Sequence, residues 1–149
     1  MINDAVLPSF EKMLMQLVAV PSVSSPSASW DQSNRPVIEL LAGWFEALGF
    51  SVERMDVPGH AGKQNLIATM GQGPGGLVLA GHTDTVPFDQ AKWSSDPFAL
   101  DYRDNRFYGL GSCDMKGFFP VILSAVQHFA NADFRQPLIV IATADEESS

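Results

Sequence analysis

The sequence LVLAGHTDTVP, residues 77–87, runs from a short apolar stretch into a histidine and an aspartate. A second apolar stretch, LIVIA at residues 138–142, is followed closely by a pair of glutamates. Continuous apolar runs of this length are typical of strands buried on both faces, as in parallel sheets. Ligands of such sheets bind beyond the carboxyl ends of the strands, so we expect these polar residues to meet at one edge.

The rest of the chain alternates between helical and extended patterns. Apolar residues recur at helical spacing in some stretches and alternate in others. We therefore predict helices at residues 7–18, 34–48 and 115–130, and further strands beginning at Phe50 and spanning residues 64–70. Asn34 is expected to cap the second helix and Gly49 to end it. Strands alternating with helices predict an α/β fold, with a mostly parallel central sheet flanked by helices.

Two connecting segments carry turn signals. The glycine-rich residues 71–76, GQGPGG, lack the Lys-Ser/Thr ending of a phosphate-binding loop and lead into a strand rather than a helix. We therefore favour a plain hairpin turn over a nucleotide site. Residues 87–108 read as a surface segment, in which Asp104 and Asn105 form a turn before a short strand.

Composition excludes several functional classes. The chain has 149 residues, 46% of them hydrophobic, and a net charge of −8 with only nine Lys and Arg, which argues against nucleic-acid binding. It has neither an apolar run long enough to cross a membrane nor an N-terminal signal peptide, so a cytoplasmic location is expected. Cys113 is the only cysteine, which excludes an internal disulfide and is consistent with a reducing compartment.

The polar residues beside the strands suit a divalent metal centre. Imidazole and carboxylate ligands fit Zn²⁺ or a similar ion, and two ions about 3.5 to 4 Å apart can share one carboxylate. Asp114, at the start of the helix predicted at residues 115–130, is the candidate bridge. One residue of the pair Glu146 and Glu147 could accept a proton from the attacking water, provided that the backbone bends after the strand. If the strand continues past His82, Asp84 lies on the same face two residues later and could orient its imidazole.

Each of these residues, taken singly, has a structural explanation. A histidine after a strand is usually structural or solvated, an aspartate at a helix start is usually a cap, and paired glutamates are usually solvated. Cys113 is more readily explained as a small buried residue than as a nucleophile, and no histidine adjoins it in a motif, which leaves a thiol hydrolase as a distant alternative. The occurrence of all the candidate ligands beside strand ends favours a metal-dependent hydrolase.

Three motifs in this order resemble the dinuclear-zinc aminoacylase and carboxypeptidase family, peptidase family M20. They are HTDTVP at residues 82–87, GSCDMKG at residues 111–117, and the strand-end pair Glu146 and Glu147. The similarity covers essentially the whole chain. It is greatest to the members that deacetylate N2-acetyl-L-ornithine. The resemblance to the family implies a zinc-dependent exopeptidase-like catalytic domain.

The resemblance also implies a role for each site residue. It places His82 on one metal, Asp114 between both metals and Glu147 on the other, with Glu146 as general acid/base and Asp84 orienting the histidine. It implies a cis peptide bond after the bridging aspartate. The implied cofactors are two Zn²⁺ per full-length subunit, with Co²⁺ as a substitute, and no organic cofactor is implied.

The implied reaction converts N2-acetyl-L-ornithine and water to L-ornithine and acetate, a step of arginine biosynthesis. Within the family, the alternatives are succinyl-diaminopimelate desuccinylase and dipeptidase activity. The alternative that is not an enzyme is a truncated, non-catalytic remnant. The expected partner is a small N-acyl amino acid, with no nucleic acid and no membrane.

The family pattern further implies that residues 1–149 form the N-terminal part of the catalytic metal-binding domain. A lid domain that makes the dimer contact, the rest of the catalytic domain, one acidic ligand and one distant histidine ligand are expected outside this sequence. On that reading the fragment alone is inactive, and the full-length protein is a homodimer.

Overall fold

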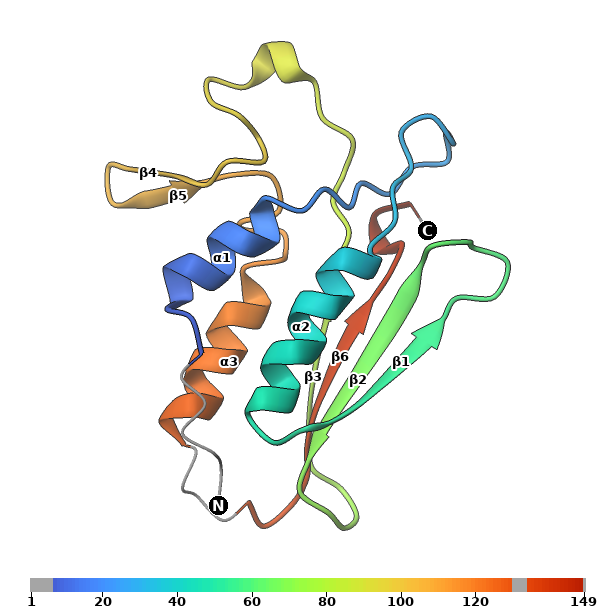
Figure 1. The fold of residues 1–149 in the computed structure, drawn as a ribbon, viewed down its shortest axis with the longest axis vertical. Helices are drawn as coiled ribbons and strands as arrows, with labels where there is room; N and C mark the ends of the chain where they lie inside the picture. The colour runs from blue at the N-terminus through green and yellow to red at the C-terminus, as the bar shows by residue number, and fades with distance from the viewer. Residues whose placement is uncertain (1–6, 130–133, 149) are drawn as a thin grey trace.

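The computed structural model describes residues 7–129 and 134–148 of the chain. Figure 1 shows a twisted sheet with the helices gathered on one side of it, and a small hairpin that extends from the body. The elements in chain order are α1 (Phe10–Val18), α2 (Arg35–Ala47), β1 (Ser51–Asp56), β2 (Gln64–Met70), β3 (Leu77–His82), η1 (Gln90–Lys92), β4 (Asp101–Arg103), β5 (Arg106–Tyr108), α3 (Phe118–His128), β6 (Leu138–Thr143) and η2 (Glu146–Ser148). None of the helices in these ranges combines the length and hydropathy that a bilayer-spanning helix needs.

Local sequence signals set the ends of the first two helices. The side chain of Ser9 accepts a hydrogen bond from the main-chain N–H of Lys12 and so caps α1. Gly49 has φ +88°, the left-handed conformation that ends α2, as predicted. Asn34 stands at the N-cap of α2, but its side chain makes no capping bond. Its amide is buried and instead bonds the main chain of Gln64, at the start of β2, and the hydroxyl of Thr83, just after β3.

The third helix begins later than the sequence predicts. The pattern indicates a helix from residue 115, whereas α3 starts at Phe118 because the preceding residues form turns. A cis peptide bond joins Asp114 and Met115, as the resemblance implied. Asp114 therefore precedes the helix by several residues, where the helix dipole contributes little. Residue 130, the predicted end of this helix, lies outside the described residues.

The sheet has the strand order β1-β2-β6-β3 and is mixed rather than mostly parallel. β1 pairs with β2 and β2 with β6 in antiparallel fashion, and the β3–β6 pair is parallel. The short connection 57–63 between β1 and β2 has no room for the crossover that a parallel pair needs, so these strands form a hairpin. The prediction of an α/β fold with a central sheet and flanking helices is confirmed.

β3 was predicted to be a buried central strand, but it lies at the edge of the described sheet. Its first residues, Leu77 and Val78, are 58% and 52% exposed. Within the described sheet, β3 pairs with one strand, β6. The apolar composition of β3 predicts a strand but does not indicate how many strands pair with it.

The glycine-rich connection between β2 and β3 is not a hairpin turn. β6 lies between these two strands, so residues 71–76 cross over the point where the chain enters β6. Gly76 has φ +114°, and a Cβ placed there would lie 2.2 Å from the carbonyl oxygen of Pro137. Glycine is needed for this close approach of two backbones.

Replacing Gly76 with alanine should lower the free energy of unfolding by about 2 to 4 kcal/mol, because the new Cβ meets rigid backbone at a strained φ. Gly43 supplies the control: it lies within α2, where a Cβ would meet no described neighbour within 4 Å, and Gly43→Ala should raise stability by about 0.5 to 1 kcal/mol. Urea unfolding midpoints of the two variants test this. Equal shifts in the same direction would contradict the assigned role of Gly76.

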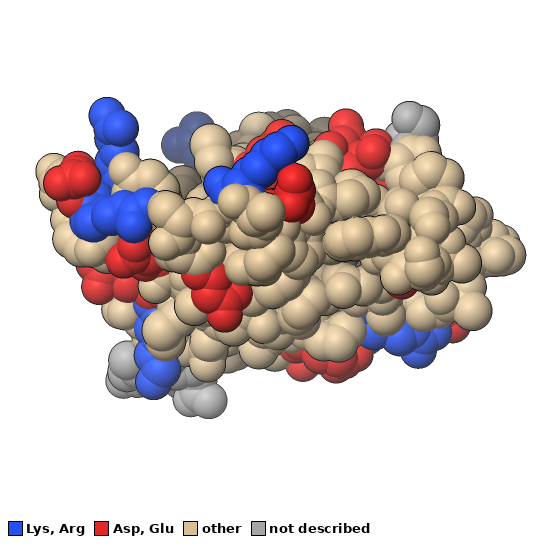
Figure 2. Space-filling view, turned by 90° about the horizontal axis from the view of Figure 1, so that it is seen from above, with Lys and Arg blue, Asp and Glu red and all other residues tan. Residues whose placement is uncertain are grey.

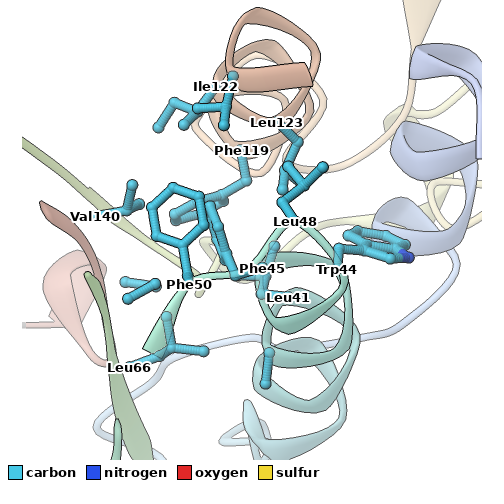
Figure 3. Close-up of a cluster of buried hydrophobic side chains, with 14 of the residues drawn as sticks. Leu41, Trp44, Phe45, Leu48, Phe50, Leu66, Phe119, Ile122, Leu123 and Val140 are labelled. Carbon is cyan, nitrogen blue, oxygen red and sulfur yellow. The ribbon is translucent and has the colours of Figure 1, made fainter. Parts of the chain in front are cut away.

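The hydrophobic core fills the space between the helices and one face of the sheet. Figure 3 shows Phe45 of α2 and Phe119 of α3 converging with Phe50 on this region, next to Leu66 and Val140 of the sheet. The rings of Phe45 and Phe50 pack edge to face at 5.1 Å between centroids. This core fixes β2 and β6 against the helices, and so fixes the strand end from which the site residues project.

Candidate metal centre

The parallel pairing of β3 and β6 places two distant parts of the sequence at one edge of the sheet. His82, the last residue of β3, lies opposite Thr143, the last residue of β6. The chain then turns at Asp145, which has φ +58°, and continues into η2. This turn is the predicted bend after the strand, and it brings Glu146 and Glu147 back toward His82 (Figure 1, near the C-terminus).

Three predicted ligands meet beyond this edge. One ligand atom from each of His82, Asp114 and Glu147 lies within 4.8 Å of the others. Nε2 of His82 is 3.2 Å from Oδ1 of Asp114 and 3.8 Å from Oε2 of Glu146. His82 is buried, whereas the side chains of Asp114 and Glu146 are 77% and 61% exposed. The arrangement is a buried imidazole facing accessible carboxylates, which is a suitable donor set for a divalent cation such as Zn²⁺.

Contacts on the other side of the imidazole hold the ring of His82 in place. Its Nδ1 is 3.1 Å from the main-chain oxygen of Asp84 and 3.4 Å from the carboxylate Oδ1 of the same residue. A neutral imidazole that carries its proton on Nδ1 donates to Asp84 and leaves the Nε2 lone pair facing Asp114. Oδ1 of Asp84 is fully buried and has no hydrogen-bond partner among the described residues, so it remains available to that N–H.

Asp84 has a second contact that sequence reasoning missed. Its Oδ2 accepts a hydrogen bond of 3.0 Å from the main-chain N–H of Glu147. Asp84 therefore touches both His82 and the backbone that carries Glu147. The two-residue spacing in the motif signalled only the contact with the histidine, because the contact with Glu147 spans 63 residues of sequence.

The carboxylates of the site influence one another. Burial raises the pKa of Glu147, and the negative charge of Asp114 raises it further, while His82 opposes this shift. Carboxylates that face one another in this way repel, and a divalent cation between them would remove the repulsion. The electrostatics of the site therefore fit a bound cation.

Lys116, in the same motif as Asp114, is fully buried. Its Nζ donates hydrogen bonds of 3.1 and 2.6 Å to the main-chain oxygens of Leu17 and Val20, at the end of α1. Burial lowers the pKa of Lys116 to about 8, and the negative charge of Asp84 partly opposes this shift. Lys116 thus fastens the turn that carries Asp114 to α1. The motif contained this lysine, but nothing in the sequence indicated its partners.

A second buried lysine, Lys63, contacts the turn that follows β6. Its Nζ is 2.8 Å from a carboxylate oxygen of Asp31 and 2.8 Å from one of Asp145. Burial alone would lower the pKa of Lys63, but the hydrogen bonds to Asp145 and Asp31 outweigh it, so this pKa is raised. Burial would raise the pKa of Asp145, and the hydrogen bonds from Lys63 and Ser24 lower it overall. Sequence reasoning named none of these residues as functional.

Cys113, which precedes Asp114, is exposed and not a small buried residue as predicted. The turns of residues 111–117 direct Lys116 inward and leave the cysteine at the surface.

Figure 2 views the molecule from the side where β3 and β6 end, and shows acidic and basic side chains interspersed with a larger uncharged area.

Known proteins that are similar to this chain include members of a peptidase family and acetylornithine deacetylases. The profile of peptidase family M20/M25/M40 matches residues 78–149. An acetylornithine deacetylase of Salmonella arizonae is 54% identical over 144 residues, which cover 97% of this chain and 38% of that protein. One from Proteus mirabilis is 52% identical over 143 residues, 96% of this chain and 37% of the relative. The chain thus spans well under half the length of these curated relatives.

Solved structures share the fold. Human carnosine dipeptidase 1 superimposes with a TM-score of 0.78 at 26% identity, over 94% of this chain and 32% of the dipeptidase. A family M20 metallo-carboxypeptidase from Sulfolobus solfataricus gives a TM-score of 0.77 at 21% identity, over 95% of this chain and 32% of that enzyme. The second similarity bears on the fold alone.

Proposed function

We propose that this chain belongs to peptidase family M20/M25/M40 and that the protein is a metal-dependent amidohydrolase that converts N2-acetyl-L-ornithine and water to L-ornithine and acetate. The observation that carries this proposal is the meeting of His82, Asp114 and Glu147 within 4.8 Å. The proposed substrate rests on identity of 52 to 54% to acetylornithine deacetylases over nearly the whole chain.

The proposed roles follow from the contacts of each side chain. His82 would offer Nε2 to a metal, because its other nitrogen faces Asp84. Asp114, with a side chain 77% exposed, would have both oxygens accessible and could bridge two ions, and Glu147 would bind the second ion. We propose two Zn²⁺ at this site, with Co²⁺ as a substitute, since nitrogen and oxygen donors accept either.

Glu146 is the proposed general acid/base. Its carboxylate lies 3.8 Å from His82 Nε2 and is 61% exposed, so it borders the site and can be reached by water and substrate. A bound metal ion acidifies water and polarises the amide carbonyl. Glu146 would take the proton from the attacking water and deliver it to the departing amine of ornithine. Asp84 would keep the proton of His82 on Nδ1 throughout.

The wider setting is part of the same proposal. Residues 1–149 would form the N-terminal part of a catalytic domain whose remaining ligands, an acidic residue and a histidine, come from other parts of the full-length protein. The share of 38% of a curated relative is consistent with this. We further propose a cytoplasmic homodimer acting in arginine biosynthesis on a small N-acyl amino acid.

Substrate competition by the full-length protein tests the function. After loading with Zn²⁺, the protein should hydrolyse N2-acetylornithine with kcat/KM at least about tenfold above that for succinyl-diaminopimelate or a dipeptide, a difference of about 1.4 kcal/mol in transition-state binding. Metal removal with a chelator should abolish the activity, and Zn²⁺ should restore it. Preference for the dipeptide would instead favour the activity named for the human structural relative. Full activity in the metal-free protein would refute the proposed chemistry.

A further inference from the structure

We propose that Lys63 is a positioning residue of the metal centre, which acts by fixing Asp145 and thereby the turn that presents Glu146 and Glu147. The proposal rests on the proposed function, since it assigns a role relative to that metal centre. Lys63 lies outside the motifs that carry the proposed ligands. It stands just before β2, on a different part of the chain from the residues it would position.

Four residues form what we call the Lys63 bridge, namely Ser24, Asp31, Lys63 and Asp145. The Lys63 side chain is only 2% exposed, and its Nζ lies 2.8 Å from Oδ1 of Asp145 and 2.8 Å from Oδ1 of Asp31. Ser24 donates its hydroxyl to Oδ1 of Asp145 at 2.7 Å, and its Oγ is 3.5 Å from the lysine Nζ. The ammonium and the hydroxyl thus hold the same oxygen of Asp145, whose side chain is 21% exposed.

The turn held by this bridge has a constrained backbone. Asp145 has φ +58°, a conformation in which a residue other than glycine needs local support. On its N-terminal side, the N–H of Ala144 donates to Oδ1 of Asn65 at 2.9 Å. On its C-terminal side, the N–H of Glu147 donates to Asp84 at 3.0 Å. Along the chain, the contact of Lys63 with Asp145 lies between these two main-chain hydrogen bonds. Lys63 places a positive charge beside the central residue of the turn.

A buried ion pair of this kind differs from the ion pairs at the protein surface. Removal of Lys63 leaves the partly buried carboxylate of Asp145 with only the hydroxyl of Ser24 and the more distant imidazole of His60, at 3.7 Å, so this carboxylate should turn toward water. For Asp145, such a movement would change the backbone directly before Glu146. By contrast, Lys92 pairs with Asp89 at 3.7 Å, and both side chains are more than half exposed, so this pair is screened by solvent.

Asp31 provides the discriminating comparison. It bonds the same lysine at the same distance as Asp145, but it lies in the loop before α2 and not on the turn that carries the glutamates. Its Oδ1 also accepts a bond from the main chain of Ser25, at 3.2 Å. Asp31→Asn therefore removes one charge from the bridge while Lys63 and Ser24 still hold Asp145. If the bridge serves only stability, the two aspartates should be equivalent.

The experiment measures Zn²⁺ affinity, kcat, KM and thermal unfolding for variants of the full-length protein. Asp145→Asn removes the charge but keeps a residue that tolerates positive φ, and Lys63→Met removes the opposite charge. Both should weaken Zn²⁺ binding, measured by competition with a chelator, by about 10-fold to 100-fold, with kcat lowered by a similar factor and KM within about threefold of wild type. Lys63→Arg should recover most of the affinity. Lys92→Met should match wild type.

Asp31→Asn should lower the melting temperature of the metal-free protein as Asp145→Asn does, while its Zn²⁺ affinity stays within about threefold of wild type. The double variant Lys63→Met/Asp145→Asn should bind Zn²⁺ no more weakly than whichever single variant has the lower Zn²⁺ affinity, because both substitutions remove the same contact. Should Lys63→Met fail to fold, the comparison of Asp145→Asn with Asp31→Asn still decides.

Equal losses of Zn²⁺ affinity in Asp31→Asn and Asp145→Asn, tracking the loss of melting temperature, would overturn the inference. Wild-type Zn²⁺ affinity and kcat in Asp145→Asn would overturn it as well. These outcomes differ from failure of the proposed function, in which the wild-type protein itself would bind no Zn²⁺ and hydrolyse no acylated amino acid.

Discussion

Asp114→Asn in the full-length protein should lower kcat/KM for N2-acetylornithine by at least about 10⁴-fold, or roughly 5.5 kcal/mol of transition-state stabilisation. An amide has one weakly donating oxygen in place of two charged ones, so it is a poor bridge between two cations. Asp114 is also the ligand nearest His82 Nε2, at 3.2 Å. The substitution should therefore weaken the binding of both ions together.

Metal content after dialysis, measured by atomic emission beside the kinetics, checks this result. Asp104→Asn is the matched control: it makes the same change at an exposed hairpin turn with φ +50°, where asparagine is equally suitable, and should leave metal content and activity unchanged. A variant at Asp114 that keeps two equivalents of Zn²⁺ would show that this residue does not bridge.

Glu146→Gln should lower kcat by about 10²-fold to 10⁴-fold while Zn²⁺ affinity stays near wild type. Glutamine preserves the shape of the side chain at the border of the site but accepts no proton. Glu147→Gln, one residue along the chain, should instead weaken Zn²⁺ binding, because Glu147 contributes a ligand atom to the group that includes His82 and Asp114. The neighbouring glutamates thus serve as controls for each other.

Chelator competition and single-turnover kinetics on both variants separate the two roles. Glu53→Gln, an exposed change on β1, should behave as wild type in both measurements. If Glu146→Gln lost metal and Glu147→Gln kept it, the assignments of acid/base and ligand would have to be exchanged. If both lost metal equally, neither would be the acid/base.

Sequence patterns predicted those features that depend on nearby residues. The bounds of β2 and the left-handed Gly49 follow from alternation and from the steric freedom of glycine, and both signals lie within a few residues. The bend at Asp145 followed from the requirement that two adjacent glutamates reach one site. The convergence of His82 with the glutamates followed from the rule that ligands gather at the carboxyl ends of strands.

Features that depend on distant partners were not predictable in this way. Residues 71–76 read as a hairpin because turn chemistry does not reveal that β6 enters between β2 and β3. Asn34 is of a residue type that commonly caps helices, yet its amide bonds Gln64 and Thr83. The roles of Lys63 and Lys116 depend on the burial of both side chains. Lysine is seldom buried, so the sequence alone predicts that both are exposed.

The position of the site at the β3–β6 pair also sets when it forms. β1 and β2 are joined by a short connection and can pair early, whereas Thr83 bonds Thr143 across 60 residues of sequence. His82 and Glu147 lie on either side of this long-range pairing. We therefore expect the proposed metal centre to assemble late, after the slow closure of a large loop, so that a chain still being synthesised holds no complete site until β6 has joined the sheet.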